Sequence, residues 1–440
     1  MAATEEPPAP AERPAGRPVV GRRRLLGLLG AAGVTGAALG ATAGAGITVA
    51  RRPSGTPDTP AAAPGDAPSS SGPSSSGPVP AGDPRRQPGV ATPPPAQVRL
   101  LAFDLDPGVA DRRDRRALST ALTDLRRLSD RLPGGELARQ EEALPLAGLA
   151  TGGATLTIGF GASLLSRLGL DAQRPEALAD LPAFPGDQLD PARGGGDVLV
   201  QVCAEDEMVA SGLADLVRRQ VGGTLRLRWA QRGFRALDPA PQPSPPPRNL
   251  MGQVDGVNNP RPGSGLFDST VWVPEWERPQ WMVHGTYLVV RRIRMLLDEW
   301  YALPMDRRDE VIGRHTTSGA PLGREALTDQ VDLAVKRPDG QPYVARDAHV
   351  RLSSPSTNGG ARMFRRPFNY DDGTRPDGTR DAGLLFLAFQ ADPRRGFVPV
   401  MHNLATAGDA LNRFIVHEAS ALFAIPPAGD RYVGQSLLEG

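Results

Sequence analysis

The stretch NLMGQVDGVNNPRPG places an acidic residue, Asp255, between glycines 252 and 256, with no helical or strand period around it. Asx residues and glycine build turns, so one interpretation is a surface turn held by the Asp255 side chain. The other is that Gly252 and Gly256 let the backbone approach a flat, bulky group at which Asp255 is aimed. A carboxylate held in that way could accept a proton and return it.

A second candidate is His349, in the stretch DAHVRLSSPSTNGGARMFRRPFNYDDG, sixteen residues before Arg365 and its neighbour Arg366. Taken singly, each element has an ordinary explanation, because a lone histidine is most often structural and an arginine pair is usually a solvated surface. Together with the GQVDG stretch, however, they form an ordered series that these ordinary explanations do not account for as a whole.

Other chemistries find little support in the sequence. It has no HExxH pair, no GxSxG elbow, no P-loop and no GxGxxG after a predicted strand, which argues against zinc hydrolase, serine hydrolase, kinase and nicotinamide-dependent functions. The single cysteine, Cys203, excludes a disulfide framework and an iron–sulfur cluster, and we expect it to be buried. A net charge of +1 argues against nucleic-acid binding. Structural roles are expected for four histidines: His284, His315, His402 and His417.

The first hundred residues differ from the rest. Residues 1–46 contain a basic run, Arg22 to Arg24, followed by a weakly apolar segment that resembles a twin-arginine export signal. An uncleaved membrane anchor is the alternative, but the segment is rich in glycine and alanine and would anchor weakly. Residues 47–96 are rich in proline, serine and glycine and predict a flexible linker. Because this export pathway carries folded proteins, often with a cofactor inserted, the leader hints at a prosthetic group.

The elements that must position the candidate residues begin near residue 97. We expect residues 97–245 to form one domain, with strands at 97–106, 155–160, 197–203 and 225–231. Leucines 118, 122, 125, 128 and 132 form one face of a helix, and a second helix spans the segment EDEMVASGLADLVRRQV. The order strand, helix, strand, strand, helix, strand is the ferredoxin-like arrangement.

Residues 246–440 follow a proline-rich joint and are expected to repeat this α+β plan. Strands are predicted at 282–295, 347–354 and 384–392, with helices over LLDEWYAL, DRRDEVIGRH and GDALNRFIVHEASALF. A pocket between duplicated sheets is a common ligand site.

The series GQVDG, AHVRL and FRRPFNYDDG resembles the dye-decolourising peroxidase family, haem enzymes with a ferredoxin-like fold and a GxxDG motif. The segments VIGRHTTSGAPLG, GLLFLAFQADPRRGFVPV and HEASALFAIPP extend the resemblance over most of residues 97–435. The resemblance implies duplicated ferredoxin-like (βαββαβ) domains with antiparallel sheets. It also implies one haem b per chain, in a pocket of the C-terminal half, and membership of the exported branch.

By this resemblance Asp255 is the acid–base catalyst, Arg365 the distal arginine, with Arg366 as the alternative, and His349 the proximal ligand of the haem iron. Gly252 and Gly256 would let the loop lie against the porphyrin.

Further positions are implied for the surroundings of the haem. Arg351, two residues after His349 in a predicted strand, would share its side and pair with a haem propionate. Arg314 is assigned to a second carboxylate. Leu384 and Phe386 are candidates for the distal wall, with ordinary core packing as the alternative.

The sequence departs from the family pattern at a few positions, including Gln253, Val257 and Pro367. An acid that hydrogen-bonds the proximal imidazole is also expected. Arg413 stands where we would look for it and Glu418 is a weak substitute, so that role stays open.

The expected function is a haem peroxidase that reduces hydrogen peroxide through an oxoferryl intermediate and oxidises aromatic or dye-type donors in one-electron steps. The alternative is an exported haem-binding protein of iron acquisition that, like a deferrochelatase, releases iron from haem and works with iron-uptake components. A ligand-binding module without haem would require the motif series to be accidental. The export signal predicts an extracellular, periplasmic or cell-envelope location with only transient membrane contact, and a homo-oligomer is possible.

Overall fold

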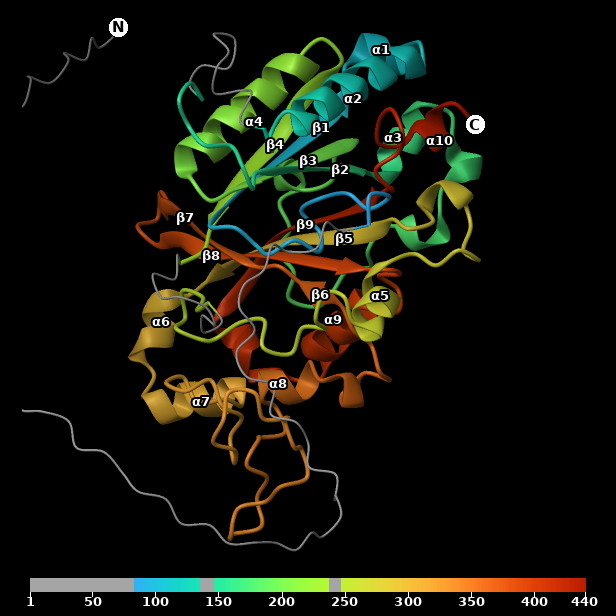
Figure 1. Ribbon diagram of the computed structural model, residues 1–440. Coiled ribbons are helices and arrows are strands. Elements are labelled where there is room, and N and C mark those ends of the chain that lie inside the picture. The colour runs from blue at the N-terminus through green and yellow to red at the C-terminus, as the bar shows by residue number, and fades with distance from the viewer. Residues whose placement is uncertain (1–82, 135–145, 237–246) are drawn as a thin grey trace, which may run out of the picture. The chain divides into compact units, whose positions relative to one another are not determined.

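The computed structural model describes residues 83–134, 146–236 and 247–440 (Figure 1). The expected leader and most of the expected linker therefore lie outside the described residues. Within these three ranges no helix combines the length and the apolar character needed to cross a membrane.

The first half has the predicted ferredoxin-like order. Its strands line up as β2-β3-β1-β4, all antiparallel. Asp114 accepts a hydrogen bond from the Ala117 amide and so begins the long helix α2, whose leucine face is buried as predicted. The elements are β1 (Gln97–Leu105), α1 (Pro107–Asp111), α2 (Arg115–Asp130), β2 (Thr155–Phe160), α3 (Ala162–Arg167), β3 (Val198–Ala204), α4 (Glu207–Val221) and β4 (Leu225–Phe234).

The second half repeats the plan with larger insertions. Its strands are ordered β7-β8-β5-β9, which is the same order that the first half shows, and β6 pairs with β8 beside β7. The elements are α5 (Gly265–Val271), β5 (Thr286–Met295), α6 (Leu297–Ala302), α7 (Met305–Ile312), α8 (His349–Leu352), β6 (Phe364–Arg365), β7 (Phe368–Thr374), β8 (Arg380–Gln390), α9 (Phe397–Thr406), β9 (Ile415–Ile425) and α10 (Gln435–Leu438).

Two predicted elements of this half are wrong. The segment 347–354 contains the single helical turn α8 rather than a strand, and one turn is too short for a helical period to show in sequence. The segment 408–423 was predicted as a helix, but it forms a 3₁₀ turn, Ala410–Arg413, and then β9. β9 pairs with β5 along its length, and this tertiary pairing overrides the local preference for helix.

The two four-stranded sheets join edge to edge. β2 meets β9 at the pair Phe160 and Ala424, and β4 meets β7 at the pair Phe234 and Asn369. Because β5 also pairs with β8, the strands form a closed ring. The domain boundary expected between residues 245 and 246 falls within residues 237–246, which lie outside the described residues.

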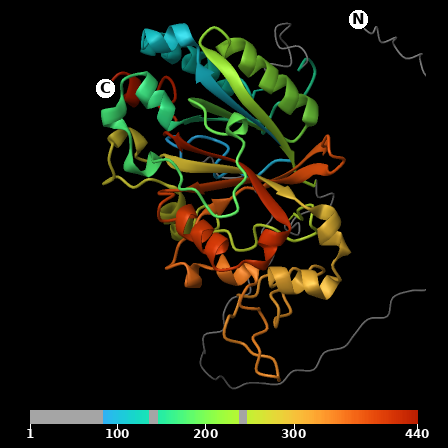
Figure 2. The same ribbon diagram turned by 180° about the vertical axis from the view of Figure 1, so that it is seen from behind.

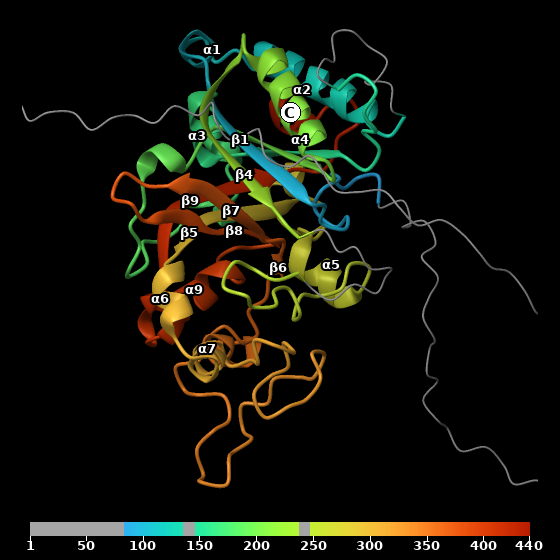
Figure 3. The same cartoon turned by 90° about the vertical axis from the view of Figure 1, so that its left-hand side faces the viewer.

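The closed ring gives each sheet an inner face, toward the other sheet, and an outer face, toward helices. A hydrophobic core between the inner faces includes Leu100, Leu199, Leu288 and Leu385. Helices α2 and α4 cover the outer face of the first sheet, and α6 to α9 lie on the outer side of the second (Figures 1, 2 and 3). The candidate residues lie on this second outer side.

Candidate functional site

Asp255 and Arg365 form an ion pair. Arg365 Nη1 lies 3.0 Å from Asp255 Oδ1, and the Asp255 side chain is only 12% exposed. Oδ1 is buried, yet it has no hydrogen-bond partner among the described residues, so the contact has the distance of an ion pair without the alignment of a hydrogen bond. A buried carboxylate oxygen with unused acceptor capacity is available to a further polar group.

The loop that carries Asp255 is a tight turn. Gly252 and Gly256 both have positive φ, +82° and +84°, a conformation that favours glycine. Gln253, which departs from the family pattern, is buried and donates to Thr316 Oγ1 at 2.8 Å. The two interpretations of this loop are therefore compatible, because the glycines make the turn and the turn presents Asp255.

Asn259 fastens the same loop to β6. Its side-chain amide donates to the Arg365 carbonyl at 2.6 Å, and its side-chain oxygen accepts from the Arg365 amide at 3.1 Å. This double hydrogen bond fixes the backbone of the arginine relative to the aspartate loop. An acid and a cation that are already fixed in place can stabilise negative charge that develops during a reaction without first having to reorganise.

Arg366 lies on the other side of β6, as the alternation of side chains along a strand demands. It is fully buried, donates to the Thr92 carbonyl and lies beside Cys203. Burial lowers the pKa of the Arg366 guanidinium and raises that of the Cys203 thiol, which is buried as expected. The structure therefore brings Arg365, and not Arg366, to Asp255.

His349 is paired with an acid that the sequence did not reveal. Asp409 Oδ2 lies 2.7 Å from His349 Nδ1, and the Asp409 side chain is 1% exposed. Asp409 Oδ1 also accepts from the Leu411 amide, which fixes the carboxylate at the start of the 3₁₀ turn 410–413. With Nδ1 engaged, Nε2 is the ring nitrogen left for a metal.

Glu418, the weak substitute for this role, is engaged elsewhere. It contacts the guanidinium groups of Arg292, Arg294 and Arg375, two of them at 2.8 and 2.7 Å. The signal that could have found Asp409 is the sequence GDAL, because an Asx residue directly before a short helical turn is typical of a cap.

The histidine and the acid–arginine pair are connected through the residues that follow α7. Gly313 ends α7 with φ +90°, and a Cβ there would lie 2.2 Å from Val350 Cγ1, so the chain passes directly against α8. The next residue, Arg314, is buried and donates to the Gly319 carbonyl at 2.8 Å. Burial and the neighbouring positive charge of Arg365 lower the pKa of Arg314. Arg314 has no ion pair among the described residues, which leaves its charge available to an anionic group.

A third group of polar residues lies on the outer face of the second sheet. Arg291, in β5, is buried, pairs with Asp187 and stacks near Phe184 and Phe397. His417, in β9, is buried, and its pKa is lowered to about 3, chiefly by burial and also by the positive charge of Arg291. His417 is therefore neutral near pH 7, and its Nδ1 has no partner among the described residues. Sequence reasoning had given it a purely structural role.

Leu384 and Phe386 belong to the same outer face. Both are partly buried. The residues that follow each of them in β8, Leu385 and Leu387, point the other way and are buried in the inner core. Phe386 contacts Phe397 of α9 at a centroid distance of 6.0 Å. Both residues are thus placed where a wall of the site would be, although packing among hydrophobic neighbours occupies them as well.

Arg351 is not placed as predicted. Because α8 is helical, Arg351 does not share the side of His349 as it would in a strand. Its guanidinium donates instead to the carbonyls of Leu333, Val344 and Ala345, at 2.7 to 3.2 Å. These bonds attach the preceding loop to α8, so Arg351 holds the loop and is not free to bind a propionate.

The arrangement suits the haem that the resemblance implies. Several buried polar atoms on this side of the second sheet lack hydrogen-bond partners among the described residues, including Asp255 Oδ1, His417 Nδ1 and Arg291 Nε. Buried polar groups are normally satisfied, and such a cluster is expected where a polar ligand belongs. An imidazole backed by a carboxylate is a suitable axial ligand, and an acid beside a guanidinium is suited to peroxide chemistry.

Comparison with known proteins identifies the family to which the chain is similar. Residues 87–235 match the profile of the Dyp-type peroxidase N-terminal domain and residues 246–430 that of the C-terminal domain. A dye-decolorizing peroxidase of Thermobifida fusca is 44% identical over 95% of this chain and 97% of its own. A deferrochelatase of Yersinia pestis is 34% identical over 81% of this chain and 84% of its own. The structure of ferric DtpA from Streptomyces lividans is similar, with a TM-score of 0.74 and 44% identity over 81% of this chain and 96% of that one.

Proposed function

The chain belongs to the Dyp-type peroxidase family and is a haem-dependent peroxidase, and we propose that Asp255, Arg365 and His349 carry its chemistry. Its substrates are hydrogen peroxide and a reductant. The observation that carries the proposal is the ion pair between Asp255 and Arg365, on a loop that Asn259 fixes to β6.

When bound, the haem supplies the iron at which the peroxide O–O bond is cleaved. His349 would hold that iron through Nε2, and Asp409 accepts a hydrogen bond from Nδ1–H, which orients the ring and raises its basicity. Arg314, buried without an acidic partner, is suited to a haem carboxylate. His417 and Arg291, each with an unused polar atom, are further candidates for polar contact with the cofactor.

Asp255 acts as the proton carrier. Its carboxylate takes the proton from one peroxide oxygen and delivers it to the other, so that the second oxygen leaves as water. Arg365 stabilises the negative charge that builds on the peroxide as the bond breaks. Leu384 and Phe386 restrict the access of water and bulky molecules.

Replacing Asp255 with asparagine tests this role. The Asp255→Asn variant should bind haem as the parent protein does, but its reaction with peroxide should slow by roughly 10²- to 10⁴-fold, because asparagine cannot carry the proton. Stopped-flow absorption after one equivalent of peroxide measures the rate. Asp268→Asn is the matched control. Asp268 also forms an ion pair with an arginine, Arg86, at 3.0 Å, but this pair lies outside the site. An unchanged rate in Asp255→Asn would reassign the proton transfer.

Release of iron from haem is the second candidate function, and the similarity to deferrochelatases favours considering it. Both activities would use His349 and the same cofactor. Product analysis separates them, because iron release leaves the metal-free porphyrin whereas peroxidase turnover leaves the haem intact. Neighbouring genes for a ferrous-iron permease and an exported iron-binding lipoprotein would favour iron acquisition.

We further propose export by the twin-arginine pathway, on the basis of the basic run in residues 22–24 and the apolar segment after it. Replacing Arg22 and Arg23 with lysine should retain the protein inside the cell. Fractionation with an activity stain measures the outcome, and unchanged export of the lysine variant would exclude this route.

A further inference from the structure

A cavity of about 470 Å³ lies between the inner faces of the two sheets, separate from the residues assigned to peroxide chemistry. Its walls include Trp229 of β4, Val290 of β5 and Leu385 of β8. The volume falls within the range of small-molecule sites. The cavity has an apolar part and a charged part, and the two parts together indicate what it would bind.

The apolar part offers a flat surface. Trp229 is 9% exposed, and its indole N–H already donates to the Gly195 carbonyl at 2.9 Å. Because that polar atom is satisfied, the ring contributes an aromatic surface beside Val290, Leu385 and Ala421. Such a surface favours a planar aromatic ligand.

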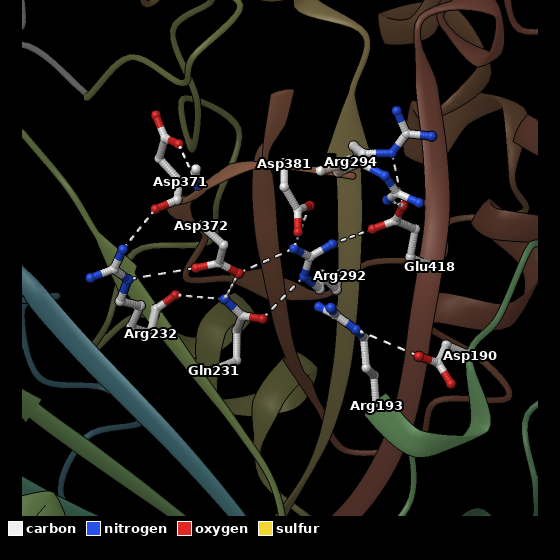
Figure 4. Close-up of polar contacts among 12 residues, drawn as sticks. Asp190, Arg193, Gln231, Arg232, Arg292, Arg294, Asp371, Asp372, Asp381 and Glu418 are labelled. Atoms are coloured by element: carbon white, nitrogen blue, oxygen red, sulfur yellow. Dashed lines mark hydrogen bonds and ion pairs between the residues drawn. The ribbon is translucent and has the colours of Figure 1, made fainter. Parts of the chain in front are cut away.

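The charged wall inside the cavity is pre-organised and internally neutralised. Arg292, 3% exposed, contacts Glu418 and lies 2.7 Å from Asp381 and 3.1 Å from Asp372 (Figure 4). Its Nε also donates to the side chain of Gln231 at 3.1 Å. Held by these partners, Arg292 fixes the shape of the wall but supplies no uncompensated charge.

Positive charge remains at the more exposed lining residues Arg193 and Arg232. Their side chains are 45% and 59% exposed, and their ion pairs are long, 3.6 Å to Asp190 and 3.5 Å to Asp372. Asp372 is shared with Arg292 and Gln231, so it compensates Arg232 only in part. Arg232 also donates to the Asp371 carbonyl at 2.9 Å, a neutral acceptor that does not cancel its charge. Two lining arginines from different elements can therefore reach an anionic group.

We propose that this cavity binds a flat aromatic anion, a carboxylate or a sulfonate, and that this ligand is an electron donor of the enzyme. The ring would lie against Trp229 while Arg193 and Arg232 hold the anionic group. The role as donor rests on the proposed peroxidase function. The binding itself rests only on the cavity.

The position of the cavity suits electron transfer. Val290 and Leu385 face the cavity, whereas their neighbours Arg291, Leu384 and Phe386 face the opposite side of the same sheet, where the haem is proposed to bind. One sheet therefore separates donor and cofactor, a distance on the order of 10 Å. Each donor gives up one electron, and two electrons with two protons convert one peroxide into two waters.

Calorimetric titration of the haem-loaded enzyme with naphthalene-2-sulfonate, without peroxide, tests the binding. The double variant Arg193→Gln/Arg232→Gln should bind it about tenfold more weakly, because two charge-assisted contacts are lost. Arg226→Gln is the matched control. Arg226 is an exposed arginine of β4, the strand that carries Arg232, but it pairs with Asp106 and does not line the cavity. Equal binding by the double variant and the parent, or no binding by the parent, would overturn the proposal.

Steady-state kinetics test the donor role with a matched pair of reductants, 2,5-dihydroxybenzenesulfonate and neutral hydroquinone. The double variant should raise the KM for the sulfonate about tenfold and leave that for hydroquinone unchanged. A KM shift for both reductants, or for neither, would exclude the cavity as the donor site. Failure of the peroxidase function itself would appear separately, as a haem spectrum that does not respond to peroxide.

Discussion

At His349 the ring nitrogen Nδ1 lies 2.7 Å from the buried carboxylate of Asp409, and this contact bears on how firmly the ring can hold iron. A carboxylate at that nitrogen fixes the tautomer and raises the basicity of the imidazole. The Asp409→Asn variant should therefore lose roughly 10- to 100-fold in haem affinity or peroxidase activity. Haem titration and peroxide kinetics measure both quantities.

The control for Asp409 is Asp206→Asn. Asp206 also begins a helix, accepting from the amides of Met208 and Val209, but it contacts no histidine. Because asparagine keeps a capping oxygen at both helix starts, this control measures the cost of the substitution where no imidazole is contacted. If both variants lose the same amount of function, the carboxylate has no special relation to His349.

The two adjacent arginines should behave differently. Arg365→Leu should slow the reaction with peroxide roughly 10²- to 10³-fold, because a fixed cation beside Asp255 is lost. Arg366→Leu should leave that rate unchanged. Its guanidinium is buried with two nitrogens unpartnered among the described residues, so leucine should be neutral or stabilising. Stopped-flow rates and urea unfolding provide the readouts, and the reverse pattern would contradict the assignment.

Sequence reasoning at the scale of residues reached Asp255, Arg365 and Arg314 because their motifs are contiguous and their types are chemically specific. It missed Asp409 and the unsatisfied His417, and it misplaced Arg351. Asp409 and His417 come to the site, and Arg351 is held away from it, only through tertiary structure. A cap aspartate sixty residues after His349 carries no local mark of the imidazole that it contacts.

At the scale of elements, the junction of α7 and α8 positions the histidine. Gly313 combines a φ of +90° with a Cβ position 2.2 Å from Val350 Cγ1, and Val350 is next to His349. Gly313→Ala should lower the free energy of unfolding for two reasons: alanine is strained at this positive φ, and its Cβ would overlap Val350. The overlap alone should cost about 1–3 kcal/mol, and it should also weaken haem binding by displacing His349. Gly340→Ala isolates the backbone cost, since Gly340 has φ +83° with nothing within 4 Å. Equal losses in both variants would remove the argument for close packing.

The regular elements were predictable where one face is buried over several turns or residues, as in α2 and β3. β9 was not, because its segment has helix-forming residues and its bulge opposite Arg292 and Ile293 breaks the alternation. The short helix α8 left no periodic signal. Both errors fall in the half that carries the site.

At the scale of the whole molecule, the ferredoxin-like plan of the first half could be predicted from its order of elements. The duplication of that plan was implied by the family resemblance, and the closure of the ring could not be predicted. The closing contacts are two single residue pairs, Phe160 with Ala424 and Phe234 with Asn369, far apart in the chain. Because the ring of strands is closed, the second sheet has the cavity on its inner face and the candidate site on its outer face. Neither location follows from local sequence.

The central claim is that His349 holds the haem iron, and replacement of its side chain tests it most directly. His349→Gly should lose the histidine-ligated absorption and resonance Raman signature of the haem, and added imidazole should restore it. His315→Gly is the control, because His315 also pairs with a carboxylate, Asp309, at 3.2 Å. A His349→Gly protein that keeps the histidine-ligated spectrum without imidazole would contradict the account.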